Sequence, residues 1–323
     1  MFNQIIMKNI GIVLSLLFFQ QILSAQIEIP GADEFQRGVP ADTTYTYEWN
    51  EENEKWEIYA RQLHFHETRE LVTSVLEQKW QREEQKWQNH EQTLKYYDEK
   101  EQEVQSVLQQ WDIYAKDWLN VQMKTTTYDR RGNAQEVLYQ EWSRPAGEWI
   151  NTIIYMISYN IDHEKSDVVI RTFSGMDKVW SNYLRYSYSD RNYSGHPRQV
   201  LVESWNKQEE SWKTFGQYNL AYNNRGKVIE EIRSTWNTSN DEWIRGLRYL
   251  ASYRRSNKTE QIEQRWNYNT RSWLNTNRIS FLYDEETGEI AEETIYNWDA
   301  GDDQWRIKTR FLYTDLRPEE DET

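Results

Sequence analysis

The sequence contains no cysteine among its 323 residues. Disulfide bonds, cysteine nucleophiles and the lipid-attachment cysteine of bacterial lipoproteins are therefore excluded. The chain also has no glycine-rich phosphate loop and no nucleophile-elbow motif, which are common signatures of nucleotide-binding proteins and hydrolases. We accordingly expect a non-enzymatic protein that carries no cofactor.

Basic residues are also fewer than acidic ones. The sequence has 38 lysines and arginines and 53 aspartates and glutamates, which give a net charge of −15. Nucleic acids and anionic membranes attract basic surfaces, so this balance argues against both as partners. Together with a mean hydropathy of −1.00, it would indicate a disordered chain. However, aromatic residues make up 15% of the sequence and supply apolar area that disordered chains lack, so we expect an ordered fold.

Long apolar runs are missing except at the N-terminus. There, Lys8 precedes an apolar stretch over residues 10–19, and Ala25 follows within a short polar segment. This pattern predicts a signal peptide over residues 1–25, cleaved near Ala25, and a short linker over residues 26–35. The apolar stretch is too short to cross a bilayer, so we expect a secreted or periplasmic protein without a membrane span in the mature chain.

What the sequence has in abundance is tryptophan, with 17 residues placed in pairs seven residues apart. The pairs recur about every 31 residues. Their first members are Trp49, Trp80, Trp111, Trp142, Phe173, Trp205, Trp236, Trp266 and Trp298. Such a period indicates tandem repeats, in which each unit buries its apolar face against its neighbours. We assign nine repeats to residues 36–315 as one domain and an acidic tail to residues 316–323.

The residues between paired tryptophans distinguish a hairpin from a helix. A spacing of seven also fits one face of a helix, but the intervening segments 143–148, 237–242 and 299–304 are rich in turn-forming residues. Each pair therefore flanks a loop, with the two rings opposed across antiparallel strands. Residues 67–124 are rich in helix-favouring residues, yet the phase of the aromatic residues continues through them, and we expect strands there as well.

Tyrosines mark the other end of each unit. Ten residues after the second tryptophan stand Tyr97, Tyr128, Tyr159, Tyr222, Tyr253 and Tyr283, and Tyr188 and Tyr313 stand after eight. Both spacings are even, so we expect the tyrosines and tryptophans to share one strand face. Aspartate or asparagine follows several of these tyrosines and glycine comes shortly after, which predicts turns.

The pattern as a whole predicts an all-β protein. Nine repeats of two strands give an antiparallel up-and-down meander of about 18 strands. We expect the sheet to curl into a spiral, in the manner of a solenoid, with a nearly continuous row of tryptophans along one edge. Whether the sheet closes depends on the twist of each hairpin, which the sequence does not specify.

The turns after the tyrosines resemble the YD repeats of Rhs-type bacterial proteins and teneurins. The matching residues are Tyr128-Asp129 with Gly132, Tyr222-Asn223 with Gly226, and Tyr283-Asp284 with Gly288. The resemblance implies a long β-sheet strip that spirals into a shell. Across the whole mature chain, the sequence resembles secreted bacterial tryptophan-rich repeat proteins of unassigned function, which imply no particular activity.

Aromatic rows suggest a binding surface for polysaccharide, because the face of a sugar ring stacks on an indole and repeated subsites add avidity. The simpler interpretation, which we favour, is that the rings hold the sheet together. Both roles are compatible if the curled sheet leaves some rings exposed. The candidate stacking residues are Trp111, Trp118, Trp142, Trp149, Trp205, Trp212, Trp236 and Trp243.

Metal sites have weaker support in the sequence. Acidic loops at residues 51–54 and at Asp299, Asp302 and Asp303 are weak candidates for Ca²⁺, although solvated loop tips have the same composition. His64 and His66 fall on one strand face, but they have no third ligand at a fixed spacing.

Two further alternatives remain open. Paired carboxylates would permit glycoside hydrolysis. An export signal, an even strand number and two aromatic girdles are also typical of outer-membrane barrels, but the strand middles carry too many polar residues for a lipid-facing band. We therefore expect an exported, non-enzymatic repeat scaffold that mediates surface or periplasmic interactions, with a polysaccharide or a cell-envelope protein as candidate partners. The alternative is a glycan-binding protein that uses exposed rows of Trp and Tyr.

Overall fold

The computed structural model describes residues 43–50, 52–68, 71–285 and 288–314. All described residues belong to one compact unit within Arg37–Thr323. The predicted signal peptide, the linker and the acidic tail lie outside the described residues.

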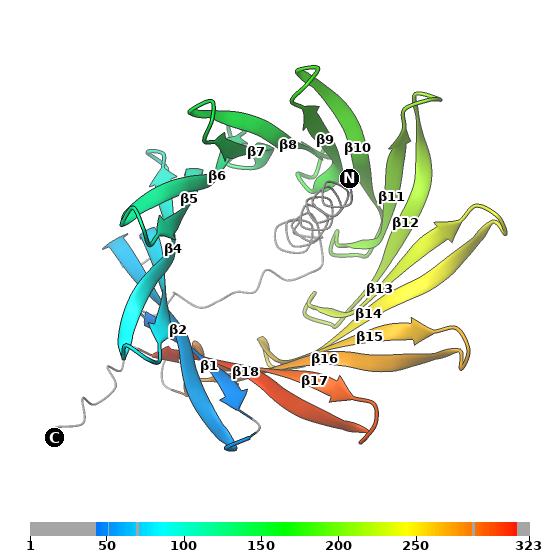
Figure 1. The fold of residues 1–323 in the computed structure, drawn as a ribbon. Coiled ribbons are helices and arrows are strands. Elements are labelled where there is room, and N and C mark those ends of the chain that lie inside the picture. Colours follow the sequence, from blue (N-terminus) through cyan, green and yellow to red (C-terminus); the bar gives the residue numbers. More distant parts are fainter. Residues whose placement is uncertain (1–42, 51, 69–70, 286–287, 315–323) are drawn as a thin grey trace, which may run out of the picture. The chain divides into compact units, whose positions relative to one another are not determined.

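The described residues form one antiparallel sheet whose 18 strands follow one another in sequence order (Figure 1). The strands are β1 (Thr43–Asn50), β2 (Lys55–Thr68), β3 (Leu71–Gln81), β4 (Lys86–Tyr97), β5 (Glu103–Asp112), β6 (Asp117–Tyr128), β7 (Ala134–Ser143), β8 (Glu148–Tyr159), β9 (Lys165–Ser174), β10 (Val179–Arg191), β11 (Pro197–Asn206), β12 (Ser211–Tyr222), β13 (Val228–Asn237), β14 (Glu242–Arg254), β15 (Asn257–Asn267), β16 (Ser272–Tyr283), β17 (Ile290–Asp299) and β18 (Gln304–Thr314). The predicted meander is confirmed. This includes β3 to β6, which occupy the segment with helical propensity.

The sheet is closed, which corrects the prediction of a spiral, solenoid-like sheet. β1 pairs with β18 over six residues, from Thr43 opposite Thr314 to Glu48 opposite Thr309. In Figure 1 the blue first strand accordingly lies beside the red last strand. Closure leaves no unpaired edge strand in the described sheet. Among the described residues, no helix is long and apolar enough to cross a membrane.

A β-bulge recurs at one position in all nine tryptophan hairpins, three residues after the second aromatic residue of the pair. The extra residues are Tyr59, His90, Val121, Thr152, Tyr183, Phe215, Gly246, Thr276 and Lys308. Because a bulge bends its strand and increases the local twist, nine bulges in register favour the curvature that closes the sheet.

The bulge also shifts the alternation of side chains by one residue. Trp212 and Thr214 share one face, but beyond Phe215 that face continues with Gln217, and Tyr222 points to the other side. The prediction that tryptophans and tyrosines share a face is therefore wrong, and the same shift applies to Tyr188 and Tyr313. We call the two sides of the sheet the Trp face and the Tyr face.

The hydrophobic core lies on the Tyr face. By the strand register, all the buried apolar side chains point to this side, and the least exposed are Val200, Val202 and Ile170. Burial raises the pKa of Tyr155 to about 12, which reflects how completely this face excludes water. The side chains of the Trp face are mostly half-buried.

The tyrosines fasten the end of each hairpin that lies away from the tryptophans. In five repeats the hydroxyl donates a hydrogen bond to the backbone carbonyl 25 residues earlier, on the preceding strand. These bonds run from Tyr97 to Val72, Tyr128 to Glu103, Tyr159 to Ala134, Tyr222 to Pro197 and Tyr283 to Lys258, at 2.6–2.9 Å. Arg191 takes this role between β9 and β10 by donating to the carbonyl of Lys165.

The turns that follow the tyrosines form as predicted. The Asp129 carboxylate accepts hydrogen bonds from the backbone N–H groups of Arg131 and Asn133, and Gly132 adopts a φ of 91°. This arrangement is an Asx turn closed by a residue in the left-handed region. A side chain at position 132 would also collide with Gln102 of the preceding turn.

Candidate functional site

Every tryptophan hairpin presents the same pair of rings on the Trp face. Within each pair the two aromatic residues lie opposite each other across the strands, as Trp111 and Trp118 do. The ring centroids are 4.8–5.3 Å apart and the planes meet at 59–70°, an edge-to-face arrangement. The predicted opposition of the rings is confirmed. Each ring is half-buried, so part of it remains accessible to a ligand.

The loop between the rings fixes this geometry. In most hairpins Asn, Asp or Ser follows the first ring and bonds the loop backbone, as Asp112 does with Tyr114 and Ala115. In all nine hairpins the residue two before the second ring has a positive φ. These residues are Glu54, Gln85, Lys116, Gly147, Lys178, Glu210, Asp241, Arg271 and Asp303. The same loop thus brings each pair of strands together with its rings in register.

Directly beside several ring pairs lies a pair of amide side chains. A glutamine two residues before the first tryptophan donates a hydrogen bond to an asparagine two residues after the second. These pairs are Gln78 with Asn89, Gln109 with Asn120, Gln140 with Asn151 and Gln264 with Asn275, at 2.7–2.9 Å. Gln92 extends one of them by donating to Gln109 at 2.6 Å, so amides run across β4, β5 and β6.

Charge divides the Trp face into two regions. Outside the bulges, the Trp face of β3 to β8 carries one acidic or basic side chain, Glu136. We call this region the amide sector. The Trp face of β10 to β18 carries acidic and basic side chains along its length, and we call it the ion-pair sector. They include Arg185, Glu203, Glu230, Arg245, Arg248, Arg254, Glu260, Arg278, Glu292 and Arg310.

In the ion-pair sector, arginines bind carboxylates and cover indole rings. Arg248 contacts Glu230 at 2.5 Å and lies over the Trp273 ring of the next hairpin, 5.9 Å from its centroid. Arg278 and Arg310 repeat the arrangement over Trp305 and Trp56. The last of these contacts crosses the junction between β18 and β1. Cation–π contacts of this kind stabilise the rings where they are.

The eight predicted stacking tryptophans fall in different surroundings. Trp111, Trp118, Trp142 and Trp149 lie in the amide sector, where no arginine or lysine of the described chain covers them. The other four lie in the ion-pair sector, where Arg185 covers Trp212 at 5.1 Å from the ring centroid. These four are Trp205, Trp212, Trp236 and Trp243. The structure therefore brings the eight rings together in pairs and distributes them over two different surfaces.

On the other side of the amide-sector strands, the Tyr face carries ion pairs. The Glu103 carboxylate lies 3.1 Å from the Lys95 amine and 2.6 Å from the Lys124 amine. Burial alone would raise the pKa of Glu103, but the hydrogen bonds and charges of Lys124 and Lys95 outweigh it and hold this pKa below its usual value. Ion pairs therefore lie on the Tyr face behind the amide sector and on the Trp face in the ion-pair sector.

The weak metal candidates remain without support from the geometry. Asp299 and Asp302 are both bound by Arg306, which supplies the positive charge that a cation would bring. The rings of His64 and His66 stack with centroids 6.5 Å apart. Within the described ranges, no cluster of three or more potential ligands occurs. Glu51 lies outside the described residues.

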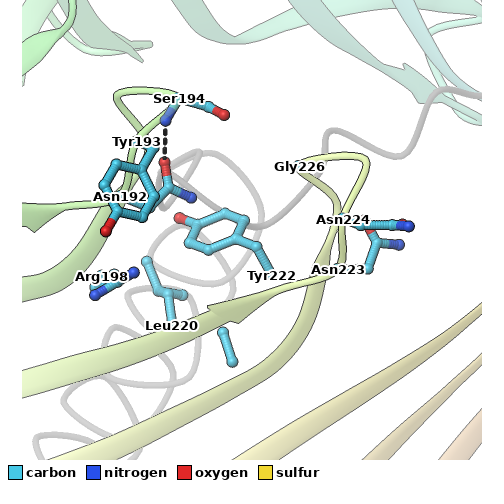
Figure 2. A pocket seen from close by; sticks show the side chains of 10 residues that line it. Asn192, Tyr193, Ser194, Arg198, Leu220, Tyr222, Asn223, Asn224 and Gly226 are labelled. Atoms are coloured by element: carbon cyan, nitrogen blue, oxygen red, sulfur yellow. Dashed lines mark hydrogen bonds between the residues drawn. The ribbon is translucent and has the colours of Figure 1, made fainter.

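A cavity of about 530 Å³ lies between the turn joining β10 to β11 and the turn joining β12 to β13 (Figure 2). Its apolar wall is formed by Leu220 and Tyr222, and Arg198 is its one cationic side chain. Asn192 and Asn223 also line it, but their carbonyl oxygens accept bonds from their own turns. None of the lining side chains is a carboxylate or a histidine, so this cavity lacks the paired acids of a glycosidase.

Sequence reasoning missed the amide pairs, although their signal was present. Glutamine precedes Trp80, Trp111, Trp142 and Trp266 by two residues, and asparagine follows their partners by two. The repetition is visible once the tryptophans are aligned. The division of the Trp face into sectors was not visible, because assigning residues to a face requires the position of the bulge.

Comparisons with known proteins place the chain in no family. Neither a family model nor a curated protein matches the sequence. A porin-like protein from Bacteroides uniformis has 12% identity and a TM-score of 0.40, with 85% of this chain and 97% of that chain covered.

Two other solved structures are similar over different lengths. A Bacteroides fragilis protein of unknown function has 17% identity and a TM-score of 0.35, covering 40% of this chain and 91% of its own. The TcdB2–TccC3–Cdc42 complex has 10% identity and a TM-score of 0.27, covering 82% of this chain and 18% of its own.

Proposed function

We propose that this protein is an exported, non-enzymatic scaffold that binds a polysaccharide through the tryptophan hairpins of its Trp face. The observation that carries the proposal is the repetition of one half-buried ring pair in nine consecutive hairpins. A ring pair contributes a weak contact with one sugar unit. Neighbouring pairs lie on one rigid sheet, so binding at the first raises the effective concentration of the polymer at the next.

The surroundings of the rings support a sugar ligand. An indole offers a flat apolar surface with a polar edge, and a primary amide offers both donors and acceptors. A pyranose has the complementary features, namely an apolar ring face bordered by hydroxyl groups. The amide beside the ring pair, as in Gln109 with Asn120, is suited to bind these hydroxyls.

Binding without hydrolysis follows from the same site. Glycosidases need two carboxyl groups on either side of the scissile bond, whereas the ring pairs of the amide sector are flanked by amides. We expect the chain length of a bound polysaccharide to stay unchanged after prolonged incubation. Release of reducing ends, proportional to the protein concentration, would favour the hydrolase instead.

Titration of the intrinsic fluorescence tests the binding proposal directly. Soluble neutral and charged polysaccharides are added to the mature chain, and we expect the tryptophan emission to shift in a saturable manner with at least one of them. Monosaccharides at the same mass concentration are the control, because avidity requires a polymer. A flat response to the whole panel would contradict the proposal. Export is tested separately, by sequencing the N-terminus of the protein recovered from the cell exterior or periplasm.

We further propose that the turns after the tyrosines share the design of YD repeats. In both, a tyrosine is followed by Asp or Asn, and here an Asx turn follows at Asp129 and Asn223. Their part in the scaffold is to join one hairpin to the next.

A further inference from the structure

The amide sector differs from the rest of the Trp face in a way that bears on the chemistry of its ligand. In a protein of net charge −15, the Trp face of six consecutive strands carries a single carboxylate, Glu136, and no cation. Arg61 of β2 reaches the β3–β4 end of this sector, where it donates to Gln78 and lies over the Trp87 ring. Over β5 to β8, anionic polymers find no basic group, and cationic polymers find almost no acidic partner. A charge brought to such a surface would lose water without gaining a counter-ion.

Four rings of this sector, Trp111, Trp118, Trp142 and Trp149, also have faces that no arginine covers, whereas Arg61 of β2 lies over Trp87. At the position five residues after the second ring, β14, β16 and β18 carry Arg248, Arg278 and Arg310, which lie over the next hairpin's indole. The corresponding residues of β4, β6 and β8 are Gln92, Met123 and Ile154. Consequently, no guanidinium covers Trp118 or Trp149, and a sugar ring that stacks on them need not displace an arginine.

The amides retain hydrogen-bonding capacity for a ligand. In the Gln109–Asn120 pair, one N–H of glutamine is used and the asparagine oxygen accepts it. The glutamine oxygen also accepts a bond from Gln92. A primary amide has two N–H donors and an oxygen with two lone pairs, so these two bonds do not exhaust either partner of the pair. Hydroxyl groups both donate and accept, and they match this remaining capacity without any change of charge.

The spacing of the hairpins suits a chain of sugars. Neighbouring strands are about 4.8 Å apart, so equivalent rings in successive hairpins lie about 9.6 Å apart across the sheet. That distance is comparable to the length of a disaccharide unit in an extended glycan. A polysaccharide that crosses β5 to β8 would therefore place one disaccharide unit on the ring pair Trp111–Trp118 and the next on Trp142–Trp149.

We propose that the amide sector is a binding site for an uncharged polysaccharide, held by the ring pairs Trp111–Trp118 and Trp142–Trp149 and by the amide pairs beside them. This inference rests on the proposed function and specifies its site and ligand class. In the ion-pair sector, arginines cover several of the rings. This sector has a structural role and binds no glycan.

Matched double variants in the two sectors test this assignment. Trp118 and Trp149 are replaced by phenylalanine in one protein, and Trp273 and Trp305 in the other. Phenylalanine is compatible with the ring pair, since Phe173 forms it with Trp180 at 5.1 Å. Thermal unfolding of both variants checks that each remains folded. Calorimetric titrations then use a soluble neutral β-glucan, a neutral galactomannan and, as charged probes, polygalacturonate and chitosan.

We expect a neutral polysaccharide to bind the unaltered protein with an affinity that changes little between low and high salt. The amide-sector double variant should bind it about tenfold more weakly, a loss of about 1.4 kcal/mol, whereas the ion-pair-sector variant should bind normally. Equal losses in both variants, or a preference for a charged polysaccharide, would overturn the inference and leave the proposed function intact. If no polysaccharide binds at all, the proposed function itself is contradicted, and this site assignment is contradicted with it.

An independent variant covers the case in which the ring changes disturb folding. Asn120→Asp places a carboxylate beside the Trp111–Trp118 pair without changing the side chain's size, and Asn275→Asp does the same beside Trp266–Trp273. Only the first should weaken binding of the neutral polysaccharide. If Asn275→Asp weakens it as much, the site does not lie in the amide sector.

Discussion

The amide sector and the ion-pair sector are built on one scaffold and differ in how the space between ring pairs is filled. Both have the same loops, bulges and edge-to-face rings, as the hairpins β5–β6 and β15–β16 illustrate. In the ion-pair sector, arginine joins a carboxylate on one side to an indole on the other. In the amide sector, uncharged side chains take its place at the pairs Trp111–Trp118 and Trp142–Trp149, and Arg61 of β2 covers only Trp87. The comparison teaches that the hairpin fold does not require an arginine over each ring pair.

The largest expected effect concerns the rings themselves. Trp118→Ala and Trp273→Ala remove equivalent residues, each of which is followed by Leu and Asn. Replacing a buried tryptophan costs about 3–5 kcal/mol, and half-burial reduces this to about 2 kcal/mol. Trp273 also loses the contact with Arg248, so its replacement should cost about 1 kcal/mol more. Urea unfolding followed by circular dichroism measures both losses, and equal values would show that the arginine adds nothing to the ring.

The second prediction concerns the charge behind the amide sector. Because the pKa of Glu103 is held below its usual value of 4.5, the folded state binds its proton less readily than the unfolded state does. Its contribution to stability is therefore complete above pH 4.5 and is lost as the pH falls through the lowered pKa. Glu103→Gln should be less stable than the unaltered protein at neutral pH, and the difference should shrink in acid.

Unfolding free energies measured from pH 7 to pH 3 test this expectation. Glu136→Gln is the control, since it removes a carboxylate from the other face of the same part of the sheet. A difference for Glu103→Gln that stays constant over this range would show that its ion pairs with Lys95 and Lys124 do not contribute.

Much of the fold was predictable because its determinants are local. The rings and the turn-forming residues between them specify each hairpin, and Asp or Asn after the tyrosine specifies each connecting turn. The bulge was not predictable, since residues as different as Tyr59, Thr152 and Lys308 occupy it and only Gly246 is a glycine. Closure depends on twist summed over 18 strands, which no single repeat encodes. Of the site, the sequence identified the tryptophans. It did not identify the amides and arginines that surround them.

A third prediction asks whether the two sectors differ on the Tyr face as well. Tyr128 fastens β6 to β5 behind the amide sector, and Tyr283 fastens β16 to β15 behind the ion-pair sector. Tyr128→Phe and Tyr283→Phe each remove one hydrogen bond to a backbone carbonyl, which should cost about 1 kcal/mol in both cases. Denaturant unfolding measures the two losses. A clear difference between them would indicate that the sectors differ through the whole thickness of the sheet.

The smallest effect is expected for a single arginine of the ion-pair sector. Arg278 lies 3.6 Å from Glu260, and both side chains are partly exposed, so Arg278→Gln should lower the free energy of unfolding by less than about 1 kcal/mol. Met123→Gln alters the same position in the amide sector, where no charge is lost. Salt at about 1 M screens exposed charges, so it should reduce the cost of Arg278→Gln and leave that of Met123→Gln unchanged. If salt affects both variants equally, the ion pair contributes nothing measurable, and the arginine acts only through the apolar contact of its side chain with the Trp305 and Tyr296 rings.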